Sequence, residues 1–372
     1  MTLDNIEILN FKNIPNAKLE FSPGINCLLG MNGMGKSNLL DAIHLLSMAR
    51  PMSSITDNAL LRHGEELMLV KGNFTTETGA SDSISCGMQK GKRKSLKRNG
   101  KEYDKLSSHI GSYPIVISTP DDSRIVSGSA EERRKLMDMV ISQADPAYLL
   151  ALIRYNKALE NRNKMLRAGL KDIILYESIE KSMEEAAVVI HEARKAWVKE
   201  IAPIVEEIYS RISGGKERTE IQYKSALNSA TMKEVLDKHR EKDQILGFTS
   251  SGLHRDDIES FLDDYSLRAL GSQGQLKTFA VALRLAIFRY LKDKKGVTPL
   301  LLLDDIFDKL DAERVENIMK EVTNQGDFGQ IFITDTNRKH LDDILEVISG
   351  PKTLINVSEG EFSPIDIESQ KA

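Results

Sequence analysis

A glycine-rich stretch at residues 30–38, GMNGMGKSN, combines residue types and a spacing that could hold phosphate groups. It fits the pattern G-x-x-x-x-G-K-[ST], in which glycines let successive backbone N–H groups approach a phosphate closely. Lys36 would reach the β- and γ-phosphates of ATP, and Ser37 would be a ligand of Mg²⁺. The nucleotide site predicted in this stretch consists of Gly30, Met31, Asn32, Gly33, Met34, Gly35, Lys36, Ser37 and Asn38.

Two adjacent carboxylates follow an apolar run in the sequence LLLLDDIFDKLD, residues 300–311. If the run is a buried strand, Asp304 could hold the metal ion through water, and Asp305 could orient or deprotonate an attacking water. Two acids after a strand can also simply begin a turn. Together with the glycine-rich stretch, however, they predict an ATPase whose candidate catalytic residues are Lys36, Asp304 and Asp305, with Ser37 and Asp304 on the metal side.

A second stretch, GSQGQLK at residues 271–277, could also receive an anion. Gly271, Ser272 and Gly274 precede a predicted helix, and the N-terminus of a helix favours negative charge. This stretch cannot serve the phosphates that the first loop already surrounds. The alternative interpretation is a simple N-cap of the helix by Ser272.

One segment of the chain is strongly basic, although the net charge of the whole chain is -4. The sequence KGKRKSLKRNGK, residues 90–101, contains seven basic residues and no acidic one. Its Asn-Gly pair predicts a β-hairpin with a type I′ turn. Such a ribbon could contact DNA phosphates without reading sequence, or it could be a solvated face. The candidate DNA-binding residues are Lys92, Arg93, Lys94, Lys97, Arg98 and Lys101; Arg133 and Arg134 either contribute or bind nearby acids.

The elements that must position these residues can be predicted from the apolar pattern. Short alternations before residue 30 predict strands, and the spacing of apolar residues after Lys36 predicts a helix. Residues 121–246 have helical spacing, which we expect Pro203 and several glycines to divide into helices of ordinary length. Strand-like runs return towards the end of the chain. We therefore expect an α/β ATPase head formed by residues 1–120 and 247–372, with an inserted all-helical lobe at 121–246.

Composition narrows the class of protein. The chain of 372 residues is 41% hydrophobic and 28% charged, which is typical of a globular protein. Cys27 and Cys86 lack any disulfide or zinc spacing, so we expect reduced thiols. No secretion signal is recognisable at the N-terminus, and the most apolar helical segment carries Arg284 and Arg289. These observations predict a cytoplasmic protein without a membrane segment.

The combination of motifs resembles a known family. The glycine loop, the S-x-G-Q sequence before a helix, the DD-x-F-D-K-L-D segment and the strand IFITD are similar to the ABC-type P-loop ATPase heads of SMC and Rad50 proteins, which have mixed sheets with flanking helices. Three further segments resemble the RecF family of bacterial recombination mediators: TPDDSRIVSGSAEERRKLMD at 119–138, GLHRDD at 252–257, and GSQGQLK.

This resemblance implies a function that the motifs alone do not. Two copies would enclose ATP and Mg²⁺, with Ser272, Gly274, Gln275 and Asp311 completing the nucleotide site of the other copy. The ATP-bound homodimer would clamp single-stranded, duplex or gapped DNA, and slow hydrolysis would release it. RecR and RecO are the implied protein partners, and the implied roles are recombinase loading, replication, DNA repair and the SOS response.

Departures from related patterns predict slow ATP hydrolysis, and the resemblance to the RecF family implies that this weak hydrolysis depends on DNA. No Gln lies near Pro120, and Asp335 occupies the place of the switch histidine of transporter ATPases. The ATPase subunit of a transporter, which is the alternative function, would need both groups. A nuclease-fused ATPase would need a whole acidic domain after Asp305. The acids near His254 lack further carboxylates at metal-ligand spacing, so we expect a structural or nucleotide-sensing role there.

Overall fold

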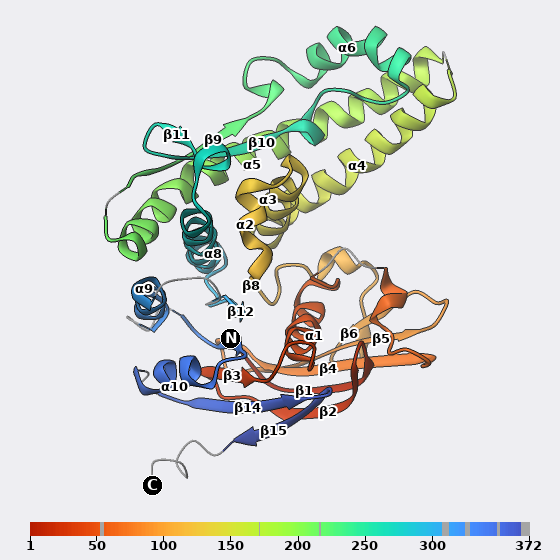
Figure 1. Ribbon diagram of the computed structural model, residues 1–372. Helices are drawn as coiled ribbons and strands as arrows, with labels where there is room; N and C mark the ends of the chain where they lie inside the picture. Colours follow the sequence, from red (N-terminus) through yellow and green to blue (C-terminus); the bar gives the residue numbers. More distant parts are fainter. Residues whose placement is uncertain are drawn as a thin grey trace. The chain divides into compact units, whose positions relative to one another are not determined.

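The computed structural model describes residues 1–52, 56–170, 172–215, 217–306, 312–323, 328–347 and 350–365 of the chain. The chain forms two compact units, which are described separately (Figure 1). Unit 1 contains Met1–Pro120 and Ile287–Ala372, and unit 2 contains Asp121–Ala286. Within the described residues, no helix is long and apolar enough to cross a membrane.

Unit 1 contains two six-stranded sheets. The antiparallel sheet has the order β2-β1-β4-β5-β6-β7, with bounds Thr2–Phe11 (β1), Ile14–Glu20 (β2), Leu67–Thr75 (β4), Ser81–Gln89 (β5), Ser95–Arg98 (β6) and Lys101–Glu102 (β7). The mixed sheet has the order β15-β14-β3-β13-β12-β8, with bounds Ile25–Leu29 (β3), Ile115–Ser118 (β8), Leu300–Asp304 (β12), Ile331–Asp335 (β13), Lys352–Ser358 (β14) and Glu361–Ile365 (β15).

The mixed sheet brings distant segments of the sequence to one edge. Strand β13 lies between β3 and β12 and is parallel to both. Strands β12 and β13 are buried at every residue, as expected for continuous apolar runs in a parallel sheet covered on both faces. The glycine loop after β3, the two acids after β12 and the residues after β13 therefore meet at the carboxyl edge of the sheet.

Helix α1 (Lys36–Met48) follows the glycine loop and contacts strands of both sheets of unit 1 (Figure 1). Its leucines and isoleucine are completely buried, which is why the predicted helix is apolar on more than one face. Helices α9 (Ala312–Thr323) and α10 (Arg338–Val347) complete the α/β part of the unit. The predicted α/β fold with mixed sheets and flanking helices is confirmed.

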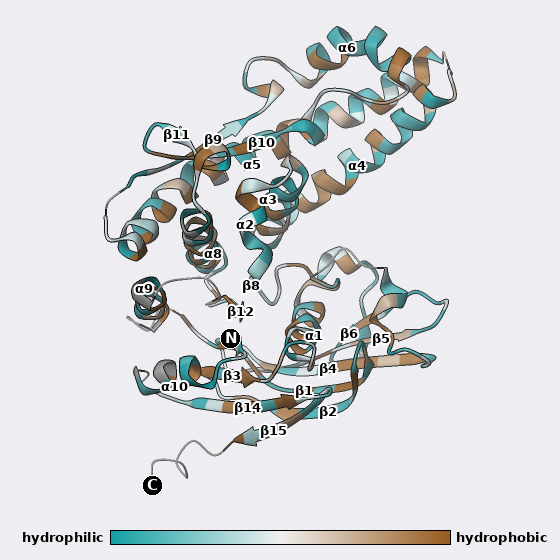
Figure 2. Ribbon diagram, viewed as in Figure 1, coloured by the Kyte–Doolittle hydropathy of each residue, from teal (hydrophilic) through white to brown (hydrophobic). Residues whose placement is uncertain are grey.

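Unit 2 is built on a hairpin of two long antiparallel helices, α4 (Pro146–Arg167) and α5 (Ile173–Ser213). Hydrophobic and hydrophilic residues alternate along both helices in Figure 2, as expected for helices with one buried face. The shorter helices of the unit are α2 (Ser123–Ser127), α3 (Ala130–Ala144), α6 (Met232–Leu246) and α7 (Leu267–Leu270). Helix α8 (Gln273–Lys295) begins in unit 2 and ends in unit 1.

Three predictions about this lobe were wrong. It is not all-helical and does not end at residue 246: β9 (Thr219–Lys224), β10 (Asp257–Leu262) and β11 (Tyr265–Ser266) form a sheet, and the unit continues to Ala286. Strands β9 and β10 lie on either side of α6 in the sequence, and their pairing brings the later segment into the lobe. Helix α5 also continues through Pro203, because Ile201 and Val205 are fully buried on both sides of it.

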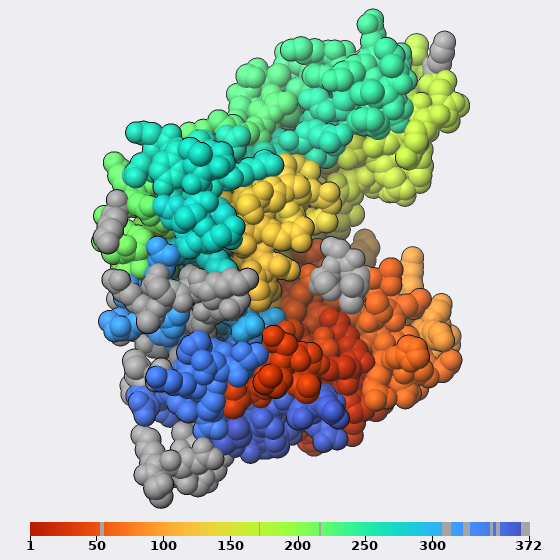
Figure 3. All heavy atoms as spheres, viewed as in Figure 1, coloured from red at the N-terminus to blue at the C-terminus, as the bar shows by residue number. Residues whose placement is uncertain are grey.

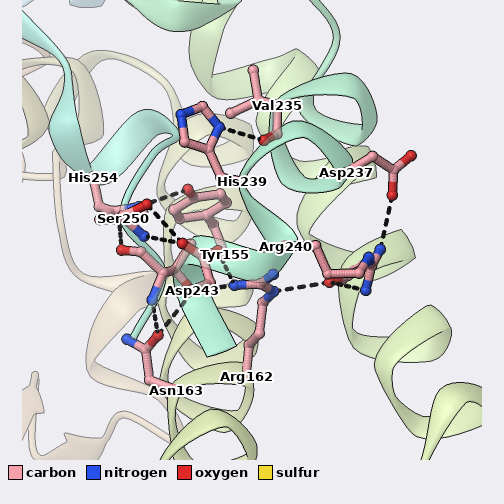
Figure 4. Close-up of polar contacts among 12 residues, drawn as sticks. Tyr155, Arg162, Asn163, Val235, Asp237, His239, Arg240, Asp243, Ser250 and His254 are labelled. Atoms are coloured by element: carbon pink, nitrogen blue, oxygen red, sulfur yellow. Dashed lines mark hydrogen bonds and ion pairs between the residues drawn. The ribbon is translucent and has the colours of Figure 1, made fainter. Parts of the chain in front are cut away.

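A buried charge network joins α6 to the helical hairpin (Figure 4). The Arg162 side chain on α4 is fully buried. Its Nε donates to Glu180 Oε1 of α5 at 2.9 Å, and its Nη1 donates to Asp243 Oδ2 of α6 at 2.7 Å. Asp243 in turn accepts from the backbone N–H and the hydroxyl of Ser250 at 2.9 and 2.7 Å. The charged residues in this part of the lobe are therefore paired, as buried charges must be.

Candidate functional site

The glycine loop of unit 1 has the backbone of a phosphate-binding loop. It connects β3 to α1, and Gly33 and Gly35 have φ angles of 82° and 117°, which side chains other than glycine rarely adopt. Gly30 is required for another reason, since a Cβ atom there would lie 2.3 Å from the carbonyl oxygen of Val357. These constraints explain the three glycines of the stretch by local geometry.

Lys36 lies at the first position of α1 and is 5% exposed. Its Nζ donates to the carbonyl oxygens of Gly30 at 2.6 Å and Met31 at 3.2 Å, so the side chain folds back over the loop. Burial lowers the pKa of Lys36, and the negative charges of Asp305, Asp304 and Asp335 oppose that shift. A cation in this position can leave two neutral carbonyls for a phosphate, which is the stronger acceptor.

The acids after β12 face the glycine loop. Asp304 Oδ1 accepts from Ser37 Oγ at 3.0 Å and from Thr334 Oγ1 at 2.7 Å. The backbone N–H of Asp305 donates to Thr334 Oγ1 at 3.0 Å, and the φ angle of Asp305 is 47°. The structure thus brings Lys36 and Ser37 next to Asp304 and Asp305, although the two pairs lie more than 260 positions apart in the sequence.

These residues surround a cavity of about 130 Å³. Its lining consists of Asn32, Gly33, Gly35, Lys36, Ser37, Asn38, Asp304 and Asp305. Met31 belongs to the same loop but does not line the cavity, and its side chain is 69% exposed. The hydroxyl of Ser37 and the carboxylate of Asp304 are hard oxygen donors, so this donor set fits Mg²⁺.

Two residues that support the loop were not predicted. Asn13 donates to the carbonyl oxygen of Gly33 at 3.2 Å and accepts from Asn38 Nδ2 at 2.7 Å, so it holds the loop from the turn between β1 and β2. Thr334 is completely buried and bonds to both acids after β12. Asn13 belongs to no motif of the sequence, and Thr334 lies within the strand IFITD, where no role was predicted for it.

Asp335 ends β13 next to the glycine loop. Its carbonyl oxygen accepts from the backbone N–H of Gly30 at 3.3 Å, and its carboxylate accepts from the backbone N–H of Asn337 at 2.7 Å. His340 Nδ1 lies 3.2 Å from Asp335 Oδ2. The strand end thus carries an aspartate in place of a histidine, and a histidine five positions later, in α10, contacts that aspartate.

The second anion-receptive stretch, the signature loop at residues 271–275, lies in unit 2 at the start of α8. Gln275 N donates to Ser272 Oγ at 3.2 Å, and Ser272 N donates to Gln275 Oε1 at 2.8 Å, which is a reciprocal capping box. The predicted N-cap by Ser272 is thus present. Ser272 is also exposed, and Gly274 follows it in the first turn. Asp311 lies outside the described residues.

The basic hairpin, residues 90–101, has the predicted turn: Asn99 and Gly100 have φ angles of 51° and 79°. Lys97 pairs with Ser85 and is exposed on the outer face of the sheet. Figure 3 shows the orange surface of this region along the edge of unit 1. Lys92, Arg93 and Lys101 are exposed as well, whereas Lys94 forms an ion pair with Asp57 at 2.7 Å.

Arg98 differs from the other basic residues of the hairpin. It pairs with Ile84 on the opposite face from Lys97, and its guanidinium donates to both oxygens of Asp82 at 3.1 and 2.7 Å. Burial raises the pKa of Asp82, but hydrogen bonds from Arg98, Asn99 and Tyr113 outweigh it, so the pKa lies below its usual value. Arg98 therefore holds the hairpin to the sheet.

The arginine pair and the GLHRDD segment of unit 2 bind one another. Arg133 donates to both oxygens of Asp257 at 2.6 and 2.9 Å, and Arg134 donates to the carbonyl oxygen of Asp256 at 2.7 Å. Buried Arg194, which was not predicted, bonds to Asp256 at 2.8 Å. Among the described residues, no cluster of three or more His, Cys, Asp or Glu could hold a metal. These contacts favour the structural alternative.

Comparisons with known proteins agree with the motifs. The family model described as the RecF/RecN/SMC N terminal domain matches residues 2–110. A DNA replication and repair protein RecF of Parabacteroides distasonis is 46% identical over 98% of this chain and 100% of its own length. A protein of the same name from Porphyromonas gingivalis is 44% identical over 97% of this chain and 100% of its own length.

Solved structures agree with these sequence relatives. The recombination mediator protein RecF-ATP in the RecFOR pathway has a TM-score of 0.87 and 29% identity, with 98% of this chain and 97% of that chain covered. An Smc head domain from Pyrococcus furiosus has a TM-score of 0.58 at 20% identity, covers 99% of this chain and 97% of that one, and shows the same fold.

Proposed function

Because the chain belongs to the RecF family of DNA replication and repair proteins, we propose that it is a DNA-binding ATPase whose ATP-bound form is a homodimer. In this proposal each copy binds the phosphates of ATP with its own glycine loop. The exposed Ser272 of the other copy then completes the site. ATP would therefore stabilise the dimer by binding two surfaces at once, which shifts the population towards the closed form.

The observation that carries this proposal is the state of the Ser272 hydroxyl. Its oxygen accepts from Gln275 N at 3.2 Å, and the exposed side chain leaves the O–H group accessible to a ligand from outside the chain. The hydroxyl lies at an exposed helix N-terminus, next to backbone N–H groups that favour an anion. A γ-phosphate carried by a second copy is a ligand of the right charge and hydrogen-bonding type.

The residues of unit 1 divide the chemistry among them. Lys36 and the backbone of the glycine loop bind phosphate, and Asp305 orients or deprotonates the attacking water. Ser37 and Asp304 would hold Mg²⁺, which supplies positive charge to the β- and γ-phosphates. No Gln near Pro120 and no histidine at position 335 are available to position the water, so we expect slow hydrolysis.

Slow hydrolysis suits a protein that stays on DNA until ATP is consumed. We propose that the dimer clamps DNA at gaps, that the exposed lysines and arginine of the basic hairpin contact its phosphates, and that hydrolysis opens the clamp. DNA-dependent ATP hydrolysis, a cytoplasmic location, contact with RecR and RecO, recombinase loading and a role in the SOS response belong to the same proposal. Family membership leaves the transporter alternative without support.

Sedimentation velocity with and without ATP tests the shared site. Ser272→Arg should bind nucleotide as a monomer but form no ATP-induced dimer, whereas Lys36→Ala should lose nucleotide binding altogether. Ser129→Arg is the matched control, because Ser129 caps α3 of the same unit in the same reciprocal manner with Glu132. Dimerisation of the Ser272→Arg protein at wild-type strength would refute the shared site.

A further inference from the structure

The side-chain amide of Gln275 links the signature loop to the end of α5. Gln275 Oε1 accepts from Ser272 N at 2.8 Å, and Gln275 Nε2 donates to Tyr265 OH at 3.0 Å and to Glu217 Oε1. The second oxygen of Glu217 accepts from the hydroxyl of Tyr209 at 2.6 Å. Tyr209 lies on α5, and its side chain is almost completely buried.

Glu217 determines which end of this amide faces Ser272. An ionised carboxylate can only accept hydrogen bonds, so the NH₂ group of Gln275 must face Glu217. The carbonyl oxygen of the amide then faces Ser272 N, which is a donor. In the opposite orientation, an NH₂ group would face Ser272 N and two acceptor oxygens would meet at Glu217, so both hydrogen bonds would be replaced by repulsive contacts.

We infer that Glu217 is a positioning residue of the shared nucleotide site, acting through Gln275 on Ser272. By fixing the amide, Glu217 fixes the backbone N–H of Ser272 and hence the direction of the hydroxyl that the γ-phosphate of the partner copy would meet. This inference rests on the proposed function and gives a role to a residue outside every motif of the chain. Glu217 itself touches no nucleotide.

Gln275→Glu separates positioning from capping. A glutamate at position 275 can still accept from Ser272 N, because Ser-x-x-Glu is a good capping box. It can no longer donate to Glu217 or Tyr265, and it brings a second negative charge next to Glu217. Loss of a hydrogen bond to a charged group should lower the equilibrium constant of dimerisation about tenfold for each site. A two-fold symmetric dimer contains the site twice, so we expect ATP-induced dimerisation to weaken by about 100-fold.

The double variant Glu217→Gln/Gln275→Glu exchanges donor and acceptor. The amide introduced at position 217 can donate to the new carboxylate at position 275 and still accept from Tyr209, so we expect dimerisation to return to within about tenfold of wild type. Glu220→Gln is the matched control: Glu220 is an exposed glutamate on β9 in contact with Gln222. All variants should bind nucleotide as monomers with wild-type affinity, because the glycine loop lies in unit 1.

Sedimentation velocity at a series of ATP concentrations decides between the outcomes. If Ser272→Arg fails to dimerise but Gln275→Glu dimerises like wild type, the shared site stands and the role of Glu217 is refuted. If the double variant is as weak as Gln275→Glu, Gln275 acts directly and not through Glu217, which also overturns the inference. Dimerisation of Ser272→Arg itself would refute the proposed function and this inference with it.

Discussion

Replacing Thr334 by valine tests whether one buried hydroxyl arranges both acids of the candidate catalytic site. Valine has nearly the same shape as threonine, so Thr334→Val removes the hydroxyl without opening a cavity. The hydroxyl donates to Asp304 Oδ1 at 2.7 Å and accepts from Asp305 N at 3.0 Å. Both bonds would be lost in a position that is completely buried.

The size of the effect of Thr334→Val depends on the hydrogen bonds that Asp304 and Asp305 keep. Asp304 Oδ1 keeps the bond from Ser37 at 3.0 Å, and Asp305 N keeps its bond to the carbonyl oxygen of Thr334 at 3.2 Å. Only the hydrogen bond to a charged acceptor is lost without replacement, which costs about 2 kcal/mol in the free energy of unfolding. If loss of this hydrogen bond also displaces the acids that orient the attacking water, and the activation free energy rises by a similar amount, kcat should fall by about 10- to 30-fold.

Single-turnover ATP hydrolysis and urea unfolding measure these two quantities. Thr334→Ser keeps the hydroxyl and is the matched control: kcat is expected near wild type, and the free energy of unfolding should fall by about 1 kcal/mol because a buried methyl group is removed. Nucleotide affinity should change little in either variant, since Lys36 and the glycine loop are intact. A wild-type kcat for Thr334→Val, or a Thr334→Ser variant as impaired as Thr334→Val, would show that the hydroxyl does not position these acids.

Three further predictions concern separate parts of the molecule. Asp305→Asn should prolong the lifetime of the DNA-bound dimer after ATP is withdrawn, and an unchanged release rate would exclude Asp305 from activating water. Lys97→Ala should lower the salt dependence of DNA binding by about one unit of slope. Arg98→Ala should mainly lower thermal stability, because the guanidinium of Arg98 is engaged by Asp82. Equal effects of the two substitutions on the slope would contradict this difference. Burial lowers the pKa of His254 to about 4, so the unfolded chain binds a proton between pH 6.5 and 4 that the folded chain does not. The stability of the fold is therefore fully present above pH 6.5 and is lost as the pH falls towards 4. Urea unfolding should show a loss of up to about 3 kcal/mol over this range, and the loss should be absent from His254→Gln.

The nucleotide site of unit 1 could be predicted from the sequence because each of its parts is local. The glycines are required by φ angles and close backbone contacts of one loop, and Asp304 ends a strand whose four other residues are leucines. An apolar run between turn signals indicates a buried strand wherever it lies in the chain. The meeting of Ser37 with Asp304 then follows from the parallel arrangement of the strands.

Contacts that depend on register or on sheet order could not be predicted in this way. Thr334 reaches both acids only because β13 lies between β3 and β12, and no local pattern gives that order. Arg98 lies on the same face of β6 as buried Leu96 because it pairs with Ile84, and a shift of one residue would reverse every side chain of β6. The pairing of β9 with β10 across α6 is non-local too, and for that reason the lobe was predicted as all-helical.

The contacts that hold the two loops explain how ATP could drive association instead of local folding. In unit 1, Asn13 already holds the glycine loop from the turn between β1 and β2. In unit 2, Ser272 is already fixed by Gln275. A ligand that meets ordered surfaces loses little free energy in ordering them, so in the proposed dimer more of its binding free energy would remain for joining the two copies. Loosening either surface should therefore weaken dimerisation before it weakens the binding of nucleotide to a single copy.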